Sequence, residues 1–322
     1  MKPLIYATGR LPASARSFVE ENCAFRHWDG AGIPPITVLA SELAAAEGLI
    51  LTGGVAGAQL LDLAPQLKVI ANIGVGYDNI DTAACRIRGV LATNTPSVLD
   101  DSVADLVLGL LLSTTRRIAE LDKAIRAGGW LPGDAQPLYG RDLSGTTLGV
   151  IGMGRVGEAV AKRARLGFNM DILYHNRSRR LAAEAAFNAR FCTLDRLLDA
   201  SDHVVLLAPL SAETRGMMGA AQFAKMKPTA TFINASRGAT VDEAALIAAL
   251  QTGVIRAAGL DVFACEPTEP DNPLLLLQNV TLTPHIGSAT ADTRERMALR
   301  AARNAVDGAL GRRPPDVVPE LR

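Results

Sequence analysis

The stretch that decides the fold reads Thr147-Leu-Gly-Val-Ile-Gly-Met-Gly-Arg-Val-Gly157. Its first five residues predict a short buried strand, and the residues from Val156 onward repeat apolar side chains at helical spacing. Between the two lies the pattern G-x-G-x-x-G. At such a junction the first glycine permits a tight turn, the second lets a pyrophosphate approach the backbone, and the third lets the helix pack against the strand. The stretch therefore predicts a dinucleotide-binding unit.

The start of this helix is the expected phosphate site, because a helix N-terminus offers N–H donors and positive potential. A glycine-rich turn without a ligand is the alternative, and the strand and helix on either side argue against it. We assign the following residues to the cofactor: Gly152, Gly154, Arg155, Val156 and Gly157.

The next predicted strand, 171–174, leads into His175-Asn176-Arg177-Ser178. An NAD site usually has Asp or Glu here to hold the ribose hydroxyls. Asn176 and Arg177 take that place in this chain, and an arginine can make a charge-assisted contact to a 2′-phosphate. Ser178 adds a hydroxyl donor. We predict NADP(H) in preference to NAD(H), and the alternative is that these arginines belong to a solvated loop.

Working outward, short apolar strands alternate with helices along the whole chain. They are expected at 4–7, 48–51, 67–73 and 90–93, and then at 147–151, 171–174, 203–208, 230–234, 257–261 and 280–283. Continuous apolar strands separated by helices indicate parallel sheets covered on both faces. We predict an α/β fold with two doubly wound parallel-sheet domains, the second a Rossmann dinucleotide-binding domain inserted in the first.

The domain boundaries follow from the same pattern. Residues 1–98 plus 289–322 are expected to form the substrate-binding domain, with the apolar face of a last helix, 289–310, returning to it. Residues 99–288 form the predicted NADP-binding domain. This second domain includes one long helix from Asp100 to Gly128 and a surface arm over 130–145.

The arm carries the apolar side chains Trp130, Leu131, Leu138 and Tyr139. Exposed apolar side chains in such a number are unfavourable on a monomer, and a symmetric dimer would bury them. We expect a homodimer, and the alternative is an arm folded onto its own domain.

The bulk composition excludes several classes of protein. The chain has 322 residues, 20% charged residues and a formal net charge of +0. A balanced charge offers no attraction to nucleic acid or to acidic membranes. We found no signal peptide and no apolar run of the roughly 20 residues that a membrane span needs. The four cysteines show no metal-ligand spacing, so we expect no metal and a cytoplasmic protein with reduced thiols.

Ionisable residues follow three predicted strands of the second half. Arg237 follows 230–234, Glu266 comes shortly after Asp261 at the end of 257–261, and His285 follows 280–283. Ligands of open α/β sheets bind beyond the carboxyl ends of the strands. Reducing a ketone needs a proton donor, which is a natural role for histidine. A nearby carboxylate holds the imidazole, and an arginine grips a substrate carboxylate. The alternatives are a loop-capping arginine and an exposed turn glutamate.

These residues together resemble the D-isomer-specific 2-hydroxyacid dehydrogenase family. The resemblance is carried by Asn72-Ile-Gly-Val-Gly-Tyr-Asp-Asn-Ile-Asp81, the glycine pattern, Asn234-Ala-Ser-Arg-Gly238, Ala258-Gly-Leu-Asp-Val-Phe263 with Glu266-Pro267, and Thr283-Pro-His-Ile-Gly-Ser288. It implies that Arg237 binds the substrate carboxylate and carbonyl, that His285 is the acid and base, and that Glu266 is its partner.

The resemblance extends to the other ligand contacts. Backbone N–H groups around Val75 and Gly76 are implied to bind the substrate carboxylate, with Gly53 and the arm's Trp130 also near the substrate. Further cofactor contacts are expected at Ser102, Ala208, Pro209, Thr214, Ala235 and Asp261.

Within the family the chain is most similar to glyoxylate/hydroxypyruvate reductases, including those that reduce 2-ketogluconate. The implied partner is a small 2-keto acid. Two alternatives remain open from the sequence. One is an NAD-dependent dehydrogenase of another branch, acting on phosphoglycerate or D-lactate. The other is a nucleotide-sensing corepressor of the same fold, because a fold does not fix a function.

Overall fold

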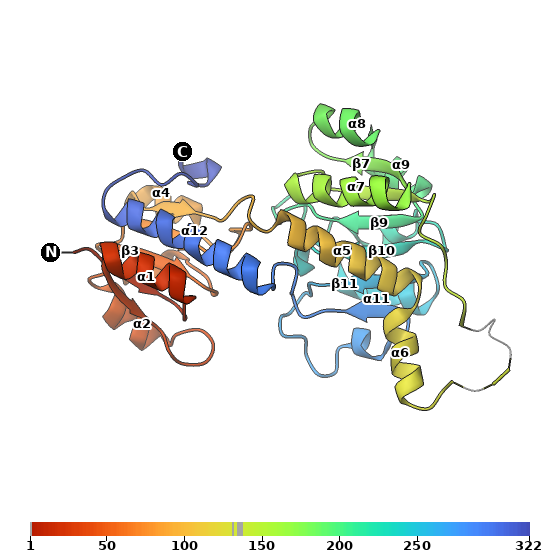
Figure 1. Ribbon diagram of the computed structural model, residues 1–322, viewed down its shortest axis with the longest axis horizontal. Helices are drawn as coiled ribbons and strands as arrows, with labels where there is room; N and C mark the ends of the chain where they lie inside the picture. The colour runs from red at the N-terminus through yellow and green to blue at the C-terminus, as the bar shows by residue number, and fades with distance from the viewer. Residues whose placement is uncertain (1, 131, 134–137) are drawn as a thin grey trace. The chain divides into compact units, whose positions relative to one another are not determined.

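The computed structural model describes residues 2–130, 132–133 and 138–322, so the arm's Leu131 lies outside the described residues. The chain divides into two compact units (Figure 1). The first unit is Met1–Leu99 together with Thr290–Arg322, and the second unit is Asp100–Ala289.

The first unit contains a parallel sheet in the order β2-β1-β3-β4-β5. Its strands are β1 (Leu4–Ala7), β2 (Ala24–His27), β3 (Gly48–Leu51), β4 (Val69–Asn72) and β5 (Leu91–Thr93). The three inner strands are almost fully buried, as expected for a parallel sheet with helices on both faces.

Helices cover both faces of this sheet. α1 (Ala13–Asn22) and α12 (Ala291–Ala309) pack on one face, and α2 (Ile36–Leu43), α3 (Ala58–Asp62) and α4 (Thr82–Arg88) on the other. The buried side of α12 consists mainly of alanines, and a Cβ at Gly308 would lie 2.4 Å from the Cβ of Val69. Small side chains therefore let the helix lie close to β4.

The second unit contains a seven-stranded parallel sheet in the order β12-β11-β10-β9-β6-β7-β8. Its strands are β6 (Thr147–Ile151), β7 (Asp171–His175), β8 (Arg190–Phe191), β9 (His203–Leu206), β10 (Thr231–Asn234), β11 (Ala257–Leu260) and β12 (Val280–Leu282). The strand order reverses between β6 and β9, which creates the switch point where dinucleotides bind in such sheets. The predicted fold class, two doubly wound parallel sheets, is confirmed.

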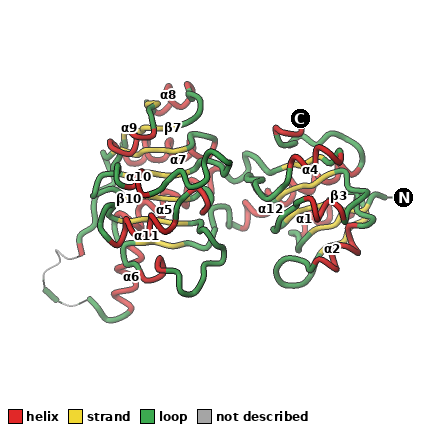
Figure 2. Tube along the Cα trace, turned by 180° about the vertical axis from the view of Figure 1, so that it is seen from behind, coloured by secondary structure: helices red, strands yellow, loops and turns green. Residues whose placement is uncertain are grey.

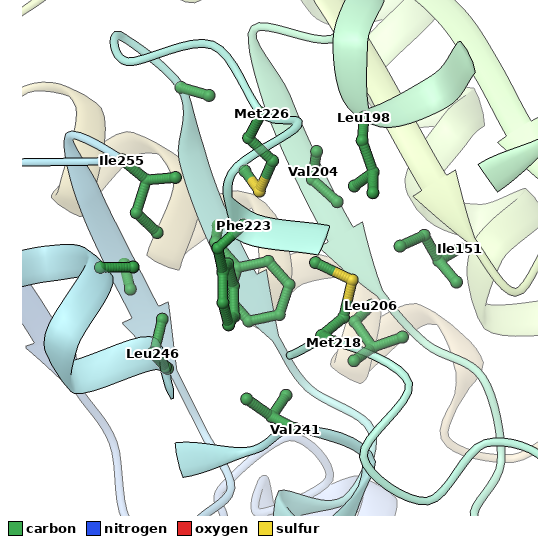
Figure 3. Close-up of a cluster of buried hydrophobic side chains, with 14 of the residues drawn as sticks. Ile151, Leu198, Val204, Leu206, Met218, Phe223, Met226, Val241, Leu246 and Ile255 are labelled. Carbon is green, nitrogen blue, oxygen red and sulfur yellow. The ribbon is translucent and has the colours of Figure 1, made fainter. Parts of the chain in front are cut away.

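This sheet also lies between two helical layers, which Figures 1 and 2 show from opposite sides. α5 (Asp100–Thr115), α7 (Arg155–Phe168) and α8 (Leu181–Phe187) share one hydrophobic core with the sheet. α9 (Leu194–Ala200), α10 (Ala220–Phe223) and α11 (Glu243–Gln251) share the other, and Figure 3 shows Phe223 among its buried side chains. Phe223 meets Phe232 edge to face in this core.

The prediction of one long helix after residue 99 is wrong. The chain forms α5 and then α6 (Ile118–Arg126), separated by Arg117 in the left-handed conformation with φ 59°. The N–H of Arg141 donates to the carbonyl of Thr115 at 3.0 Å, in place of a further helical turn. Apolar spacing continues across the break, so the sequence pattern did not reveal it.

Two strands were not anticipated. β2 and β8 are edge strands of their sheets, and their residues are exposed or half-buried. Edge strands lack the continuous apolar run that marks a buried strand, so their residues carry little signal. Among the described residues, no helix is both long and apolar enough to cross a membrane.

Gly157 is the glycine on which the packing of α7 depends. A Cβ at this position would lie 2.4 Å from the carbonyl oxygen of Gly152, which is backbone and cannot rotate away. We expect Gly157→Ala to destabilise the protein by about 2–3 kcal/mol, as overpacking does. Thermal unfolding measures this, with Gly154→Ala as control, because a Cβ there meets nothing within 4 Å. Equal melting temperatures for both variants would contradict the argument.

Buried His203 makes stability depend on pH. Burial lowers the pKa of His203 to about 4 from 6.5, and its Nδ1 lies 2.6 Å from the hydroxyl of Thr231. His203 therefore becomes protonated near pH 6.5 in the unfolded chain but only near pH 4 in the folded chain. We expect the free energy of unfolding to fall by about 3 kcal/mol over that range. Urea titrations should show a smaller loss for His203→Asn, and an equal loss would refute this.

Candidate active site

Three neighbouring strands of the second unit end in loops that carry the predicted catalytic residues. β10, β11 and β12 lie side by side and parallel, so their carboxyl ends meet at one edge of the sheet. Arg237 follows β10, Glu266 follows β11 and His285 follows β12. The sheet therefore brings a cation, a carboxylate and an imidazole to a common edge.

The loop of Arg237 is held by hydrogen bonds to its own backbone. The carbonyl of Arg237 accepts from Asn234 Nδ2 at 3.2 Å and from Thr240 Oγ1 at 2.6 Å. The guanidinium donates to the carbonyl of Ser236 at 2.9 Å. A Cβ at the following Gly238 would lie 1.8 Å from the carbonyl oxygen of Phe263, so only glycine lets the two loops approach this closely.

His285 and Glu266 form a hydrogen-bonded pair. His285 Nδ1 lies 2.7 Å from Glu266 Oε2, and the other carboxylate oxygen accepts from the N–H of Phe263 at 3.0 Å. The side chains remain 47% and 35% exposed, so a small molecule can reach the imidazole. The bond at Nδ1 leaves Nε2, on the far side of the ring, as the nitrogen that can exchange a proton with a substrate.

Asp261 fixes the loop that carries His285. Asp261 is 2% exposed, and its carboxylate accepts from Thr283 Oγ1 at 2.7 Å and from the N–H groups of Ile286 and Gly287 at 2.8 and 2.9 Å. These donors lie on both sides of His285, whose φ is 53°. A non-glycine residue in the left-handed region needs such support from its surroundings. The sequence predicts Asp261 at the cofactor, and the structure shows its carboxylate bonded to this loop.

The electrostatics of the edge favour an ionised Glu266. Burial works to raise the pKa of its carboxyl, but the hydrogen bonds from His285 and from the Phe263 N–H outweigh it. The charges of His285 and Arg237 add to this, and the pKa is lowered overall. Arg237 is thus close enough to act electrostatically on Glu266.

The glycine segment has the geometry that a dinucleotide requires. Gly152 has φ 101°, and a Cβ there would lie 2.6 Å from the backbone nitrogen of Ala208. At Gly154, the N-cap of α7, a Cβ would point into open space, which leaves the backbone accessible to a phosphate. Arg155 opens the helix and pairs with Asp100 at 3.4 Å. Gly152, Gly154 and the start of α7 therefore fit a pyrophosphate.

The polar residues of the loop after β7 have two different roles. Asn176 holds the glycine segment, because its Oδ1 accepts from the N–H of Met153 at 2.8 Å and its Nδ2 donates to the Met153 carbonyl at 3.2 Å. Arg179 is bonded to Glu184, and Arg180 to Glu158 at 2.7 Å. Arg177 is exposed, and within the described chain it forms no ion pair.

The remaining cofactor candidates lie near the same edge of the sheet. Ala208 and Pro209 follow β9, and Thr214 Oγ1 donates to the Pro209 carbonyl at 2.6 Å. Ala235 follows β10, and Ser102 lies in the first turn of α5. Among the described residues, no group of three or more His, Cys, Asp or Glu is arranged to hold a metal ion.

The predicted substrate residues Gly53, Val75 and Gly76 lie in the first unit. The carbonyls of Gly74, Val75 and Gly76 accept from Thr95 N at 2.9 Å, Asn94 Nδ2 at 2.8 Å and Asn72 Nδ2 at 2.7 Å. In the described structure the N–H groups of these three residues make no hydrogen bond. A run of available N–H groups is a typical anion-binding nest.

Neither Asn72 nor Asn94 was predicted from the sequence to have a role. Asn72 is 6% exposed, and an amide buried at the end of β4 was the signal that could have indicated its use. Trp130, the residue expected near a partner's substrate, is 72% exposed.

Comparisons with known proteins agree with this geometry. Residues 108–287 match the family model described as D-isomer specific 2-hydroxyacid dehydrogenase, NAD binding domain. The curated glyoxylate/hydroxypyruvate reductase B of Citrobacter koseri is 47% identical over 312 residues, which cover 97% of this chain and 96% of that protein. The protein of the same name from Escherichia coli is 48% identical, with the same coverage of both chains.

Solved structures show the same relationship. The TT0316 protein from Thermus thermophilus is 40% identical with a TM-score of 0.89, covering 98% of this chain and 99% of its own. An NADPH-dependent glyoxylate/hydroxypyruvate reductase from Sinorhizobium meliloti, solved with NADP and malonate, is 34% identical with a TM-score of 0.89, covering 100% and 98%. The chain therefore belongs to the D-isomer specific 2-hydroxyacid dehydrogenase family and is an oxidoreductase that uses a nicotinamide cofactor.

Proposed function

We propose that the chain reduces glyoxylate and hydroxypyruvate, and also 2-ketogluconate, to the corresponding D-2-hydroxy acids, with NADPH as the preferred cofactor. The observation that carries this proposal is the His285–Glu266 pair, 2.7 Å apart at the strand ends beside Arg237. The names of the curated relatives support the first two substrates. 2-Ketogluconate rests on the sequence resemblance.

In this proposal His285 is the proton donor. A dinucleotide held by Gly152, Gly154 and the start of α7 would supply the hydride that the keto carbon receives. His285 gives the proton on Nε2 to the keto oxygen, and the imidazole becomes neutral. Glu266 holds the ring through its hydrogen bond to Nδ1, which leaves Nε2 to donate the proton. Arg237 binds the substrate carboxylate and polarises the carbonyl next to it.

The substrate carboxylate is assigned to the N–H groups around Val75 and Gly76. Their carbonyls are fixed by Asn94 and Asn72, which keeps the opposite N–H groups in a defined orientation. Donors that are already ordered bind an anion without a further entropic cost for ordering the donors. Gly53, where a Cβ meets nothing within 4 Å, leaves room for the rest of the substrate.

NADPH preference is assigned to Arg177 with Ser178. Two neighbouring arginines already have carboxylate partners, whereas Arg177 follows β7 directly after the Asn176 that holds the glycine segment. Its guanidinium can pair with a 2′-phosphate, and no carboxylate stands at the position where NAD enzymes hold the ribose. The Sinorhizobium meliloti relative is described as NADPH-dependent.

We also propose a homodimer built on the second unit. Around α6 and the arm, the side chains of Ile118, Ile125, Trp130 and Tyr139 are between 54% and 72% exposed. Leu166 on α7 is 69% exposed. A second copy would remove this apolar surface from water. A cytoplasmic location is proposed with it, because Cys23, Cys85, Cys192 and Cys265 are all unbridged.

The catalytic assignment is tested by His285→Ala. We expect turnover of glyoxylate and hydroxypyruvate to fall by about 10²–10⁴, because a positioned acid contributes that much. NADPH affinity, measured by fluorescence titration, should stay close to that of the unmodified protein. Cys265→Ser, beside Glu266, is the control and should keep full activity. Near-normal turnover in His285→Ala would refute the assignment.

The cofactor assignment is tested by Arg177→Ala. Loss of a charge-assisted contact should raise the Michaelis constant for NADPH by roughly 10- to 100-fold while the constant for NADH barely moves. Initial rates with both cofactors measure this. Arg179→Ala is the matched control, because that guanidinium is bonded to Glu184. Equal effects of Arg177→Ala on both cofactors would contradict the proposal.

A further inference from the structure

Two loops of the first unit leave the sheet side by side, at the carboxyl ends of β3 and β4. These strands pair in parallel, with Leu51 opposite Asn72. The loop after β3 contains Gly53, and the loop after β4 contains the N–H groups around Val75 and Gly76. The keto acid proposed above contacts both loops, so their relative position decides how well it fits.

Asn79 joins these two loops through a single amide nitrogen. Its Nδ2 donates to the carbonyl of Gly54 at 2.9 Å and to Oδ1 of Asn72 at 3.3 Å. An asparagine amide has two N–H donors, so one is available for each partner. The backbone of Asn79 is also tied to the loop after β3, because its carbonyl accepts from the N–H of Ala56 at 2.8 Å.

The hydrogen bond from Asn79 also favours one orientation of the Asn72 amide. Asn72 Oδ1 accepts from Asn79, which leaves Asn72 Nδ2 to donate to the carbonyl of Gly76 at 2.7 Å. If this amide turned over, its oxygen would face the Gly76 carbonyl, and two acceptors repel each other. A Cβ at Gly74 would lie 3.1 Å from Asn72 Nδ2, so the amide is closely packed against the segment that it holds.

We propose that Asn79 is the positioning residue of the keto-acid site. Through Asn72 it holds the donors assigned to the substrate carboxylate, and through Gly54 it holds the loop where the rest of the substrate is expected to lie. The inference rests on the proposed substrate site, and Asn79 acts through these neighbours rather than on the reacting atoms. Asn72 is 6% exposed and Asn79 is half-buried, so water replaces these hydrogen bonds poorly when they are lost.

The position of these donors makes the expected effect specific to substrate binding. The N–H groups around Val75 and Gly76 are assigned to a carboxylate that does not change during the reaction, so they bind the substrate and the transition state alike. Loss of such an interaction raises the Michaelis constant and leaves turnover nearly unchanged. The glycine segment that fits the cofactor belongs to the second unit, so NADPH affinity should not change.

The first test compares initial rates of glyoxylate and hydroxypyruvate reduction in Asn79→Ala and in the unmodified full chain. We expect the Michaelis constant for both keto acids to rise about three- to tenfold, and turnover to change by less than about twofold. Asn79→Leu, which keeps the size of the side chain and lacks its donors, should behave alike and keeps the test valid if Asn79→Ala fails to fold. Asn22→Ala is the matched control, because that amide donates to the carbonyl of Phe18 within α1 at 2.8 Å. Its constants should equal those of the unmodified chain.

A double-mutant cycle separates positioning from a general loss of stability. If Asn79 acts through Asn72, Asn79→Ala should raise the Michaelis constant of Asn72→Ala by clearly less than it raises that of the unmodified protein, whereas independent effects multiply. Fully multiplied effects would overturn the inference. So would unchanged Michaelis constants in Asn79→Ala and Asn79→Leu, or a loss confined to turnover.

Binding of oxamate, an unreactive analogue of a 2-keto acid, separates this inference from the proposed function. Calorimetric titration of the NADPH-bound chain should show an affinity about three- to tenfold lower in Asn79→Ala. That result would support the inference even in a chain that reduces no keto acid, which would by itself refute the proposed function. Unchanged oxamate affinity in Asn79→Ala, or no oxamate binding by the unmodified chain, would overturn the inference.

Discussion

The buried carboxylate of Asp261 is the contact on which the candidate site depends. It accepts three hydrogen bonds from the loop after β12 and so ties the end of β11 to the backbone on both sides of His285. A carboxylate that accepts several N–H and O–H donors is among the stronger anchors available inside a protein. Because this loop is fixed, the imidazole of His285 is held in position for its hydrogen bond to Glu266.

The backbones of the neighbouring loops are also fixed by close contacts and hydrogen bonds. Gly238 allows the Arg237 loop to approach Phe263, and Asn234 and Thr240 hold the carbonyl of Arg237. In the first unit, Asn72 and Asn94 hold backbone carbonyls of the Gly74–Gly76 segment in the same way. Buried amides and hydroxyls thus fix loops whose exposed groups remain available to a ligand.

The fold class could be predicted because continuous apolar strands and the glycine pattern are signals that a short stretch of sequence contains. The sequence pattern missed the break at Arg117, where the Thr115 carbonyl accepts a hydrogen bond from the distant Arg141 N–H, a tertiary contact that apolar spacing does not reveal. It placed Arg237, Glu266 and His285 at strand ends, which the structure shows, and their roles remain proposals. It did not foresee that Asn176 bonds to Met153 or that Asp261 bonds to the His285 loop, because such pairings depend on the tertiary structure.

The first unit is the last to be completed during synthesis, because the chain returns to it through α12. β3 and β4 of that unit pack against the alanines of a helix that ends at Ala309. A ribosome makes the whole second unit, Asp100–Ala289, before that helix exists. The second unit can therefore form its core before α12 is available, while one face of the first sheet is covered only by α1. During that interval, the apolar side chains that α12 later covers are exposed to solvent and can associate with other chains.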